Sequence, residues 1–122
     1  MEHRRSQSIV QDKIFRFAVQ IVGYIRQQPN DRVNLVLNIQ LLRSGTSIGA
    51  NVEEAQAGQS RPDFISKNSI ALKEARECPY WLRLLIAAKI MPEKRLAELR
   101  DEADEIKRIL GSIVVRTKKR IV

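Results

Sequence analysis

Two stretches of the chain carry small or apolar residues at alternating spacings of three and four, and this pattern limits the possible folds more than any other feature. The first stretch contains Phe64, Asn68, Ala71, Ala75, Cys78, Leu82 and Leu85, and the second contains Leu96, Leu99, Ala103, Ile106, Leu110 and Ile113. A heptad period of this kind turns one side of a helix toward neighbouring helices. Because strand-like alternation is absent from the sequence, the pattern predicts an all-α bundle.

Two further helices are expected before these stretches. One face of the first carries Val10, Ile14, Phe17, Ile21, Tyr24 and Ile25, and Phe15, Val19 and Val22 widen it. A turn at residues 29–31 follows, because proline stops a helix and Asn and Asp compete for backbone hydrogen bonds. We predict an up-and-down four-helix bundle in one domain, residues 1–122, with helices over about 8–28, 32–57, 61–89 and 92–118.

Three positions punctuate the second half of the chain. Ser60 is expected to cap the third helix, with Asp63 as the acidic residue of a capping box. Pro79 lies inside the heptad pattern, and since the period continues beyond it, we predict a kink and not a stop. Pro92 is expected in the first turn of the last helix.

Length and residue usage indicate where the chain functions. Its 122 residues contain no repeat and no linker-like run, which favours a single domain. No stretch has the order of a signal peptide or approaches the ~18 consecutive apolar residues of a membrane span, so we expect a cytoplasmic protein without membrane contact. Cys78 is the single cysteine and His3 the single histidine, so we expect no disulfide, metal or cofactor.

The stretch RSGTSIGANVEEAQ, residues 43–56, dominates the second expected helix. At about 100° per residue, one narrow face collects Leu37, Leu41, Ser44, Ile48, Val52 and Ala55. Arg43, Ser47, Asn51 and Glu54 fall within about 80° on an adjacent strip. We expect this strip to form a hydrogen-bonded network in the protomer core or at a subunit boundary.

The first half of the same helix is apolar on two opposed sides, because Leu35, Ile39 and Leu42 lie roughly opposite the narrow face. One four-helix core cannot cover both sides, so we predict self-association through this helix. Gly45 and Gly49 form a GxxxG spacing; each costs the helix about 1 kcal/mol relative to Ala, and we expect the close approach of another backbone to offset that cost. The alternative is a helix buried centrally within one domain.

These motifs resemble a known family. RSGTSIGANVEEAQ, followed by SRPDFISKNSIALKEARE and YWLRLL, resembles the small bacterial four-helix bundle proteins first noticed as products of intervening sequences in large-subunit ribosomal RNA genes. The resemblance covers about residues 9–118. Its motif positions in this chain are Arg43, Ser47, Asn51, Glu54, Asp63, Phe64, Lys73, Glu74, Tyr80 and Trp81. Pro79 departs from the family pattern, in which a helix-compatible residue precedes the Tyr-Trp pair.

The resemblance implies an up-and-down protomer assembled into a ring-shaped homopentamer, without established enzymatic activity. The family is also similar to the accessory variability proteins of diversity-generating retroelements, basic pentamers thought to bind a reverse transcriptase and nucleic acid. These properties are what the resemblance implies for this chain.

The residues themselves do not favour catalysis. Glu53 and Glu54 are adjacent and diverge by about 100° on a helix, so they cannot act as a general acid/base pair on one atom. Glu74 and Glu77 are three apart, but the Glu-x-x-His pairs of a di-metal bundle are missing. We expect no enzyme, and we interpret Cys78 as a small buried hydrophobe.

Tyr80 and Trp81 leave two interpretations open. Aromatic side chains of this kind can stack on nucleic-acid bases. We favour the other interpretation, in which the pair anchors packing within the bundle or a subunit interface.

Net charge is the main indication of a partner. A formal charge of +8 attracts polyanions over a Debye length of about 8 Å, so we expect RNA or DNA to bind. The densest basic set follows the last helix and comprises Lys107, Arg108, Arg116, Lys118, Lys119 and Arg120. Any one of these residues is equally compatible with a solvated helix end that complements the helix dipole.

Two classes of function therefore stay open. One is a non-enzymatic oligomeric module that binds nucleic acid in a ribonucleoprotein, through phosphate and without base readout. The other is a structural adaptor ring that docks a protein and has no nucleic-acid role.

Overall fold

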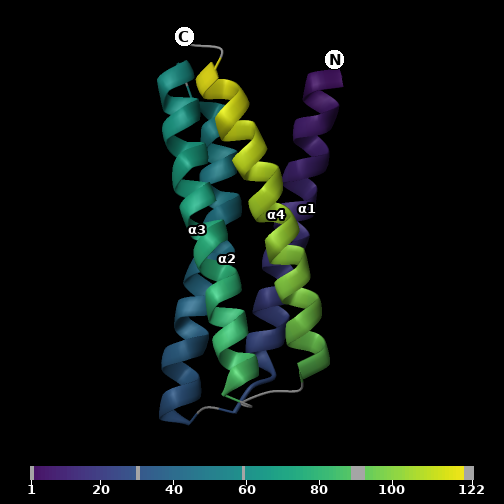
Figure 1. Ribbon diagram of the computed structural model, residues 1–122, viewed down its shortest axis with the longest axis vertical. Helices are drawn as coiled ribbons and strands as arrows, with labels where there is room; N and C mark the ends of the chain where they lie inside the picture. Colours follow the sequence, from purple (N-terminus) through teal and green to yellow (C-terminus); the bar gives the residue numbers. More distant parts are fainter. Residues whose placement is uncertain (1, 30, 59, 89–92, 120–122) are drawn as a thin grey trace.

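The structure of the protein is a computed structural model that describes residues 2–29, 31–58, 60–88 and 93–119. Within these ranges the secondary structure is four α-helices and no strand, which confirms the all-α prediction. The helices are α1 (Glu2–Arg26), α2 (Arg32–Ala57), α3 (Arg61–Ala87) and α4 (Glu93–Lys119). They run alternately up and down, so that α1 begins and α4 ends at the same end of the bundle (Figure 1).

The starts of α2 and α3 follow local capping chemistry. The Asp31 side chain accepts a hydrogen bond from the Asn34 backbone N–H at 3.0 Å, and Ser60 accepts one from the Asp63 N–H at 3.2 Å. Each cap satisfies a backbone donor that has no partner within the helix. The predicted role of Ser60 is confirmed, whereas α1 begins about six residues earlier than predicted and Pro92 lies outside the described residues.

Helix α3 continues through Pro79 as one helix of 27 residues. The proline has no N–H to donate to the carbonyl four residues earlier, but its ring is buried against the bundle. Packing on both sides of Pro79 therefore holds the helix together, and the prediction that Pro79 does not stop the helix is confirmed.

The core is built mainly from the predicted heptad positions. The fully covered side chains include Phe17 and Ile21 of α1, Leu41 and Ile48 of α2, Leu82 and Leu85 of α3, and Leu96, Leu99, Ile106 and Leu110 of α4. Burying side chains of this size removes about 1.5–3 kcal/mol each of unfavourable hydration. At the end of α4, Val114 is more deeply buried than Ile113, which packs at the edge.

Helix α1 is held less tightly than the others. The most extensive helix contacts join α2 with α3 and α3 with α4, whereas fewer residues of α1 contact α2 and the fewest contact α4. The N-terminal part of α1 stands apart from α2 and α3 (Figure 1). As a result, α1 leaves part of its apolar arc uncovered within one protomer.

Gly45 and Gly49 serve the packing of α1 on α2. A Cβ atom added at Gly45 would lie 3.2 Å from Ile21 Cγ1, and one at Gly49 would lie 3.3 Å from Ile14 Cγ2. Within the protomer, the atoms that approach these glycines belong to α1 side chains of the same chain, and the close approach of a second subunit stays a prediction. The GxxxG spacing therefore explains a contact within the protomer.

Candidate nucleic-acid interface and the polar network behind it

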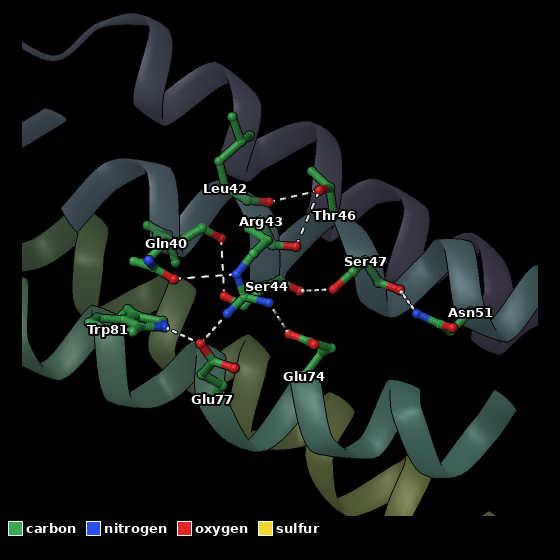
Figure 2. A network of polar contacts seen from close by, with 11 residues as sticks. Gln40, Leu42, Arg43, Ser44, Thr46, Ser47, Asn51, Glu74, Glu77 and Trp81 are labelled. Atoms are coloured by element: carbon green, nitrogen blue, oxygen red, sulfur yellow. Dashed lines mark hydrogen bonds and ion pairs between the residues drawn. The ribbon is translucent and has the colours of Figure 1, made fainter. Parts of the chain in front are cut away.

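Arg43 joins α2 to two carboxylates of α3 (Figure 2). Its Nη1 donates to Glu74 Oε2 at 2.9 Å, and its Nη2 pairs with Glu77 Oε1. Gln40 Oε1 also accepts a hydrogen bond from Arg43 Nε at 3.3 Å. The Glu74 side chain is only 13% exposed and that of Arg43 is 45% exposed, so the cluster is a half-buried network at the edge of the α2–α3 contact.

The same network fixes Trp81. Its indole Nε1 donates to Glu77 Oε1 at 2.9 Å, and its ring packs partly against the core. The Tyr80 ring lies edge-on to the Trp81 ring, with centroids 5.1 Å apart and planes at 76°. Tyr80 itself is 50% exposed. The packing interpretation therefore holds for Trp81. Tyr80 packs against Trp81 but leaves half of its surface exposed, and its role as a subunit-interface anchor stays a prediction.

The predicted polar strip does not form one network. Ser47 Oγ donates to the Ser44 carbonyl at 3.2 Å, and Asn51 Nδ2 donates to the Ser47 carbonyl at 2.8 Å, so both bond to their own helix. Arg43 and Glu54 are about 16 Å apart along the axis, and Glu54 pairs with Lys67 of α3 at 2.9 Å. The prediction was wrong because short side chains bond to the preceding turn while long ones reach across to α3.

Cys78 lies behind this network and is fully buried. Burial raises the pKa of its thiol to about 12, a hydrogen bond with Ser44 acts in the opposite direction, and the nearby Glu77 and Glu74 carboxylates raise it further. Since the thiolate is the reactive form, Cys78 is inert in the folded protein. Its interpretation as a small buried hydrophobe is confirmed.

Only part of the basic set predicted on α4 is exposed in the described residues. Arg108, Arg116, Lys118 and Lys119 are exposed, and Arg116 donates to Ser112 Oγ at 3.0 Å. Lys107 is less exposed and pairs with Asp104 at 3.3 Å. Arg120 lies outside the described residues. The exposed members follow the last three turns of α4, where they also complement the helix dipole.

A second basic row, which was not predicted from the sequence, follows the outer side of α3. Lys73, Arg76 and Arg83 are exposed, and Tyr80 stands between the two arginines. Spacings of three, four and three place all four residues on one side of the helix. Among the described residues, none of the three cations has an ion-pair partner. The sequence signal was the position of these residues opposite the buried heptad seam.

Most of the exposed large hydrophobic side chains lie on α1 and α2. We define the apolar face as the exposed side chains Phe15, Val19 and Val22 of α1 together with Leu35, Val36 and Ile39 of α2. An open groove between α1 and α2 continues it and is lined chiefly by Ile14, Phe15, Ala18, Gly49 and Ala50. Exposed apolar side chains on two neighbouring helices indicate a candidate interaction site.

Two further observations concern metal binding and membrane insertion. Across the described ranges, no group of three or more His, Cys, Asp and Glu side chains is arranged to hold a metal ion. No described helix combines the length and the apolar character that crossing a membrane requires.

The fold and these surfaces define a four-helix bundle with a polar network between α2 and α3, a basic outer side on α3 and α4, and an uncovered apolar face on α1 and α2. The chain belongs to the 23S rRNA-intervening sequence protein family, whose model matches residues 6–112.

A solved structure supports this assignment. The chain is similar to a protein of unknown function from the S23 ribosomal protein family of Bacteroides thetaiotaomicron, at 44% identity and a TM-score of 0.82. The match covers 88% of this chain and 96% of the other. Among curated proteins, none matches the chain. The similarity to accessory variability proteins stays an expectation.

Proposed function

We propose that the protein is a self-associating bundle without catalytic activity that binds RNA or DNA through phosphate contacts, as an accessory module of a ribonucleoprotein. The observation that carries this proposal is the set of exposed cations on the outer sides of α3 and α4, several of them without an ion-pair partner among the described residues. Unpaired cations are free to replace the counterions of a phosphate backbone.

Self-association rests on the apolar face. Val19, Leu35 and Ile39 are each about half exposed within one protomer, and burying them against another copy would remove this surface from water. A homopentameric ring is the assembly that the family resemblance implies. Such a ring would repeat the basic sides of α3 and α4 and would multiply the net charge of +8.

The comparisons support the nucleic-acid partner by association. The matching family is described by its link to 23S rRNA intervening sequences, and the solved relative is assigned to a ribosomal protein family. These associations concern the family and its solved relative, and they make RNA the first ligand to test for this protein.

The test is the salt dependence of RNA affinity. Affinity should fall linearly with salt on a log–log plot, with a slope of about −0.7 to −0.9 per phosphate contact. Changing Lys118 and Lys119 to Ala should lower the slope by about one to two units per protomer engaged. The matched control replaces Lys94 and Arg95, which lie at the acidic end of α4 where Arg95 pairs with Glu98 at 3.7 Å.

A protein-adaptor ring is the second candidate. The groove between α1 and α2 favours it, because apolar grooves of this type receive side chains of a partner. Absence of RNA and DNA binding even at low salt would remove the nucleic-acid proposal and leave the adaptor as the account of the assembly.

A further inference from the structure

We propose that Tyr80 and the basic row of Lys73, Arg76 and Arg83 form a binding site for single-stranded nucleic acid, in which an unpaired base stacks on the Tyr80 ring. This proposal rests on the proposed function and goes beyond it, because it names the site and the form of the ligand.

The first argument is the composition of the row. An exposed aromatic ring lies between cations on one side of a helix, and Lys73 and Arg83 are separated by about 15 Å along the axis. No acidic residue of α3 lies in this row, because Glu74 and Glu77 both turn toward Arg43. Cations that follow a backbone and an aromatic ring that stacks on bases are the two components of single-strand recognition.

The second argument is the fixed orientation of the ring. Tyr80 packs edge-on against Trp81, Trp81 donates to Glu77, and Glu77 is held by Arg43 (Figure 2). This chain of contacts limits the freedom of Tyr80 before any ligand arrives, so less conformational entropy is lost when a base stacks. Trp81 and Arg43 are thus positioning residues for the site.

The third argument concerns the form of the ligand. Bases in a duplex are stacked on one another and are not available to a side chain on a flat helix surface, whereas single strands and loops expose their faces. A half-exposed tyrosine on an open surface therefore selects unpaired bases. It provides no hydrogen-bonding pocket, so base preference should be slight.

The central experiment measures binding of the full chain to a labelled oligouridylate, to oligothymidylate of the same length and to an RNA duplex, by fluorescence anisotropy at several salt concentrations. Tyr80→Ala should weaken single-strand binding by about 5- to 150-fold, the range measured for loss of one stacked base. The salt slope should stay unchanged, because no phosphate contact is lost. Tyr80→Phe should retain the affinity, and duplex binding should change little.

The basic row provides a complementary measurement. Replacing Lys73, Arg76 and Arg83 together by Ala should reduce the salt slope on single strands by about two units, at about 0.7 per phosphate contact. Equal losses for the RNA and DNA strands assign the site to the shared phosphate and base chemistry. A loss for one strand alone narrows the ligand to that strand and still supports the site.

Trp81→Phe tests whether Trp81 positions Tyr80. The variant keeps an aromatic neighbour for Tyr80 but removes the hydrogen-bond donor to Glu77. This change should weaken single-strand binding severalfold in the wild-type background and should have no effect in Tyr80→Ala. A purely structural role of Trp81 would give equal losses of single-strand affinity in both backgrounds and would refute its role as a positioning residue.

Three outcomes would overturn the proposal, and they are distinguishable. If the wild-type protein binds RNA but Tyr80→Ala binds single strands equally well, the site is elsewhere and the proposed function survives. If Tyr80→Ala disrupts assembly in light scattering, Tyr80 belongs to a subunit boundary. If the wild-type protein binds neither RNA nor DNA at low salt, the proposed function and this site both fail.

Discussion

The outer side of α1 and α2 differs from that of α3 and α4 in the kind of surface it presents. Eight of the eleven large hydrophobic side chains found exposed in the described residues lie on α1 and α2. The cations without ion-pair partners gather more densely on α3 and α4, where they form the basic row and the end of α4. This separation supports the proposal that α1 and α2 provide the assembly surface and that α3 and α4 bind a charged ligand.

Tyr80 sharpens this comparison because it is the large exposed aromatic residue on the charged half. On the apolar half, Phe15 is 61% exposed and borders the groove. The two aromatic residues have similar exposure but different neighbours, because Tyr80 stands between cations whereas Phe15 lines a groove that also contains Ile14 and Ala18. Neighbouring chemistry, more than exposure alone, separates a stacking site from an assembly site.

The largest expected effect is on assembly. Changing Val19 and Ile39 to Glu should abolish the proposed self-association and leave a folded monomer, because both side chains lie outside the core and charge there opposes burial between subunits. Light scattering measures the mass and circular dichroism the helix content. Ile70→Glu on α3, also at an exposed apolar position, is the matched control and should leave assembly intact; equal behaviour of both variants would contradict the division of the surface.

A smaller effect is expected at the Arg43 network, which joins the two halves. Arg43→Met leaves Glu74 and Glu77 without their cation. We expect the free energy of unfolding in urea to fall by about 1–2 kcal/mol and no more, because water screens the half-exposed Arg43. Adding Glu74→Gln and Glu77→Gln should recover part of that loss.

The control for this network is the exposed pair of Lys67 and Glu54. Lys67→Ala should cost about 0.5 kcal/mol or less, because water screens exposed ion pairs. If Arg43→Met and Lys67→Ala lowered the free energy of unfolding equally, the Arg43 network would have no special role in joining α2 to α3.

A smaller change in stability is expected from substitutions at the helical glycines. Gly111→Ala on α4 should stabilise the protein by about 0.5–1 kcal/mol, because its Cβ would meet nothing within 4 Å. Gly45→Ala should gain less or lose stability, since its Cβ would press on Ile21. Thermal unfolding measures both, and an equal gain at both positions would mean that α1 yields to the added methyl group.

No effect is expected for thiol reagents at pH 8. The Cys78 pKa is raised to about 12, so the thiol stays protonated at that pH, and its burial prevents access. Mass spectrometry after iodoacetamide treatment should show modification in denaturant but not in the native protein. Rapid native modification would show that the α2–α3 contact opens more readily than its packing indicates.

The sequence was sufficient for the four helices and most of the core, because heptad periodicity depends only on local spacing. It was insufficient for the Arg43 network, since the partners of Arg43 depend on how α3 is aligned along α2. The exposure of Tyr80 could have been inferred from the sequence, because the seam at Ala75 and Cys78 determines which side of α3 faces outward. The neighbours of Gly45 could not, since spacing alone does not tell a contact within the chain from one between subunits.

The modest contact of α1 with its neighbours has a consequence for how the chain acquires its structure. Contacts of α2 with α3 and of α3 with α4 join helices adjacent in sequence, which close short loops and form early. Helix α1 docks partly on α4, the most distant helix in sequence, and fewer residues meet there than between any other pair of neighbouring helices. We therefore expect α1, although it is synthesised first, to complete its contact with α4 only after α4 has formed. Its amides should therefore exchange with solvent by a partial opening that leaves α2, α3 and α4 protected.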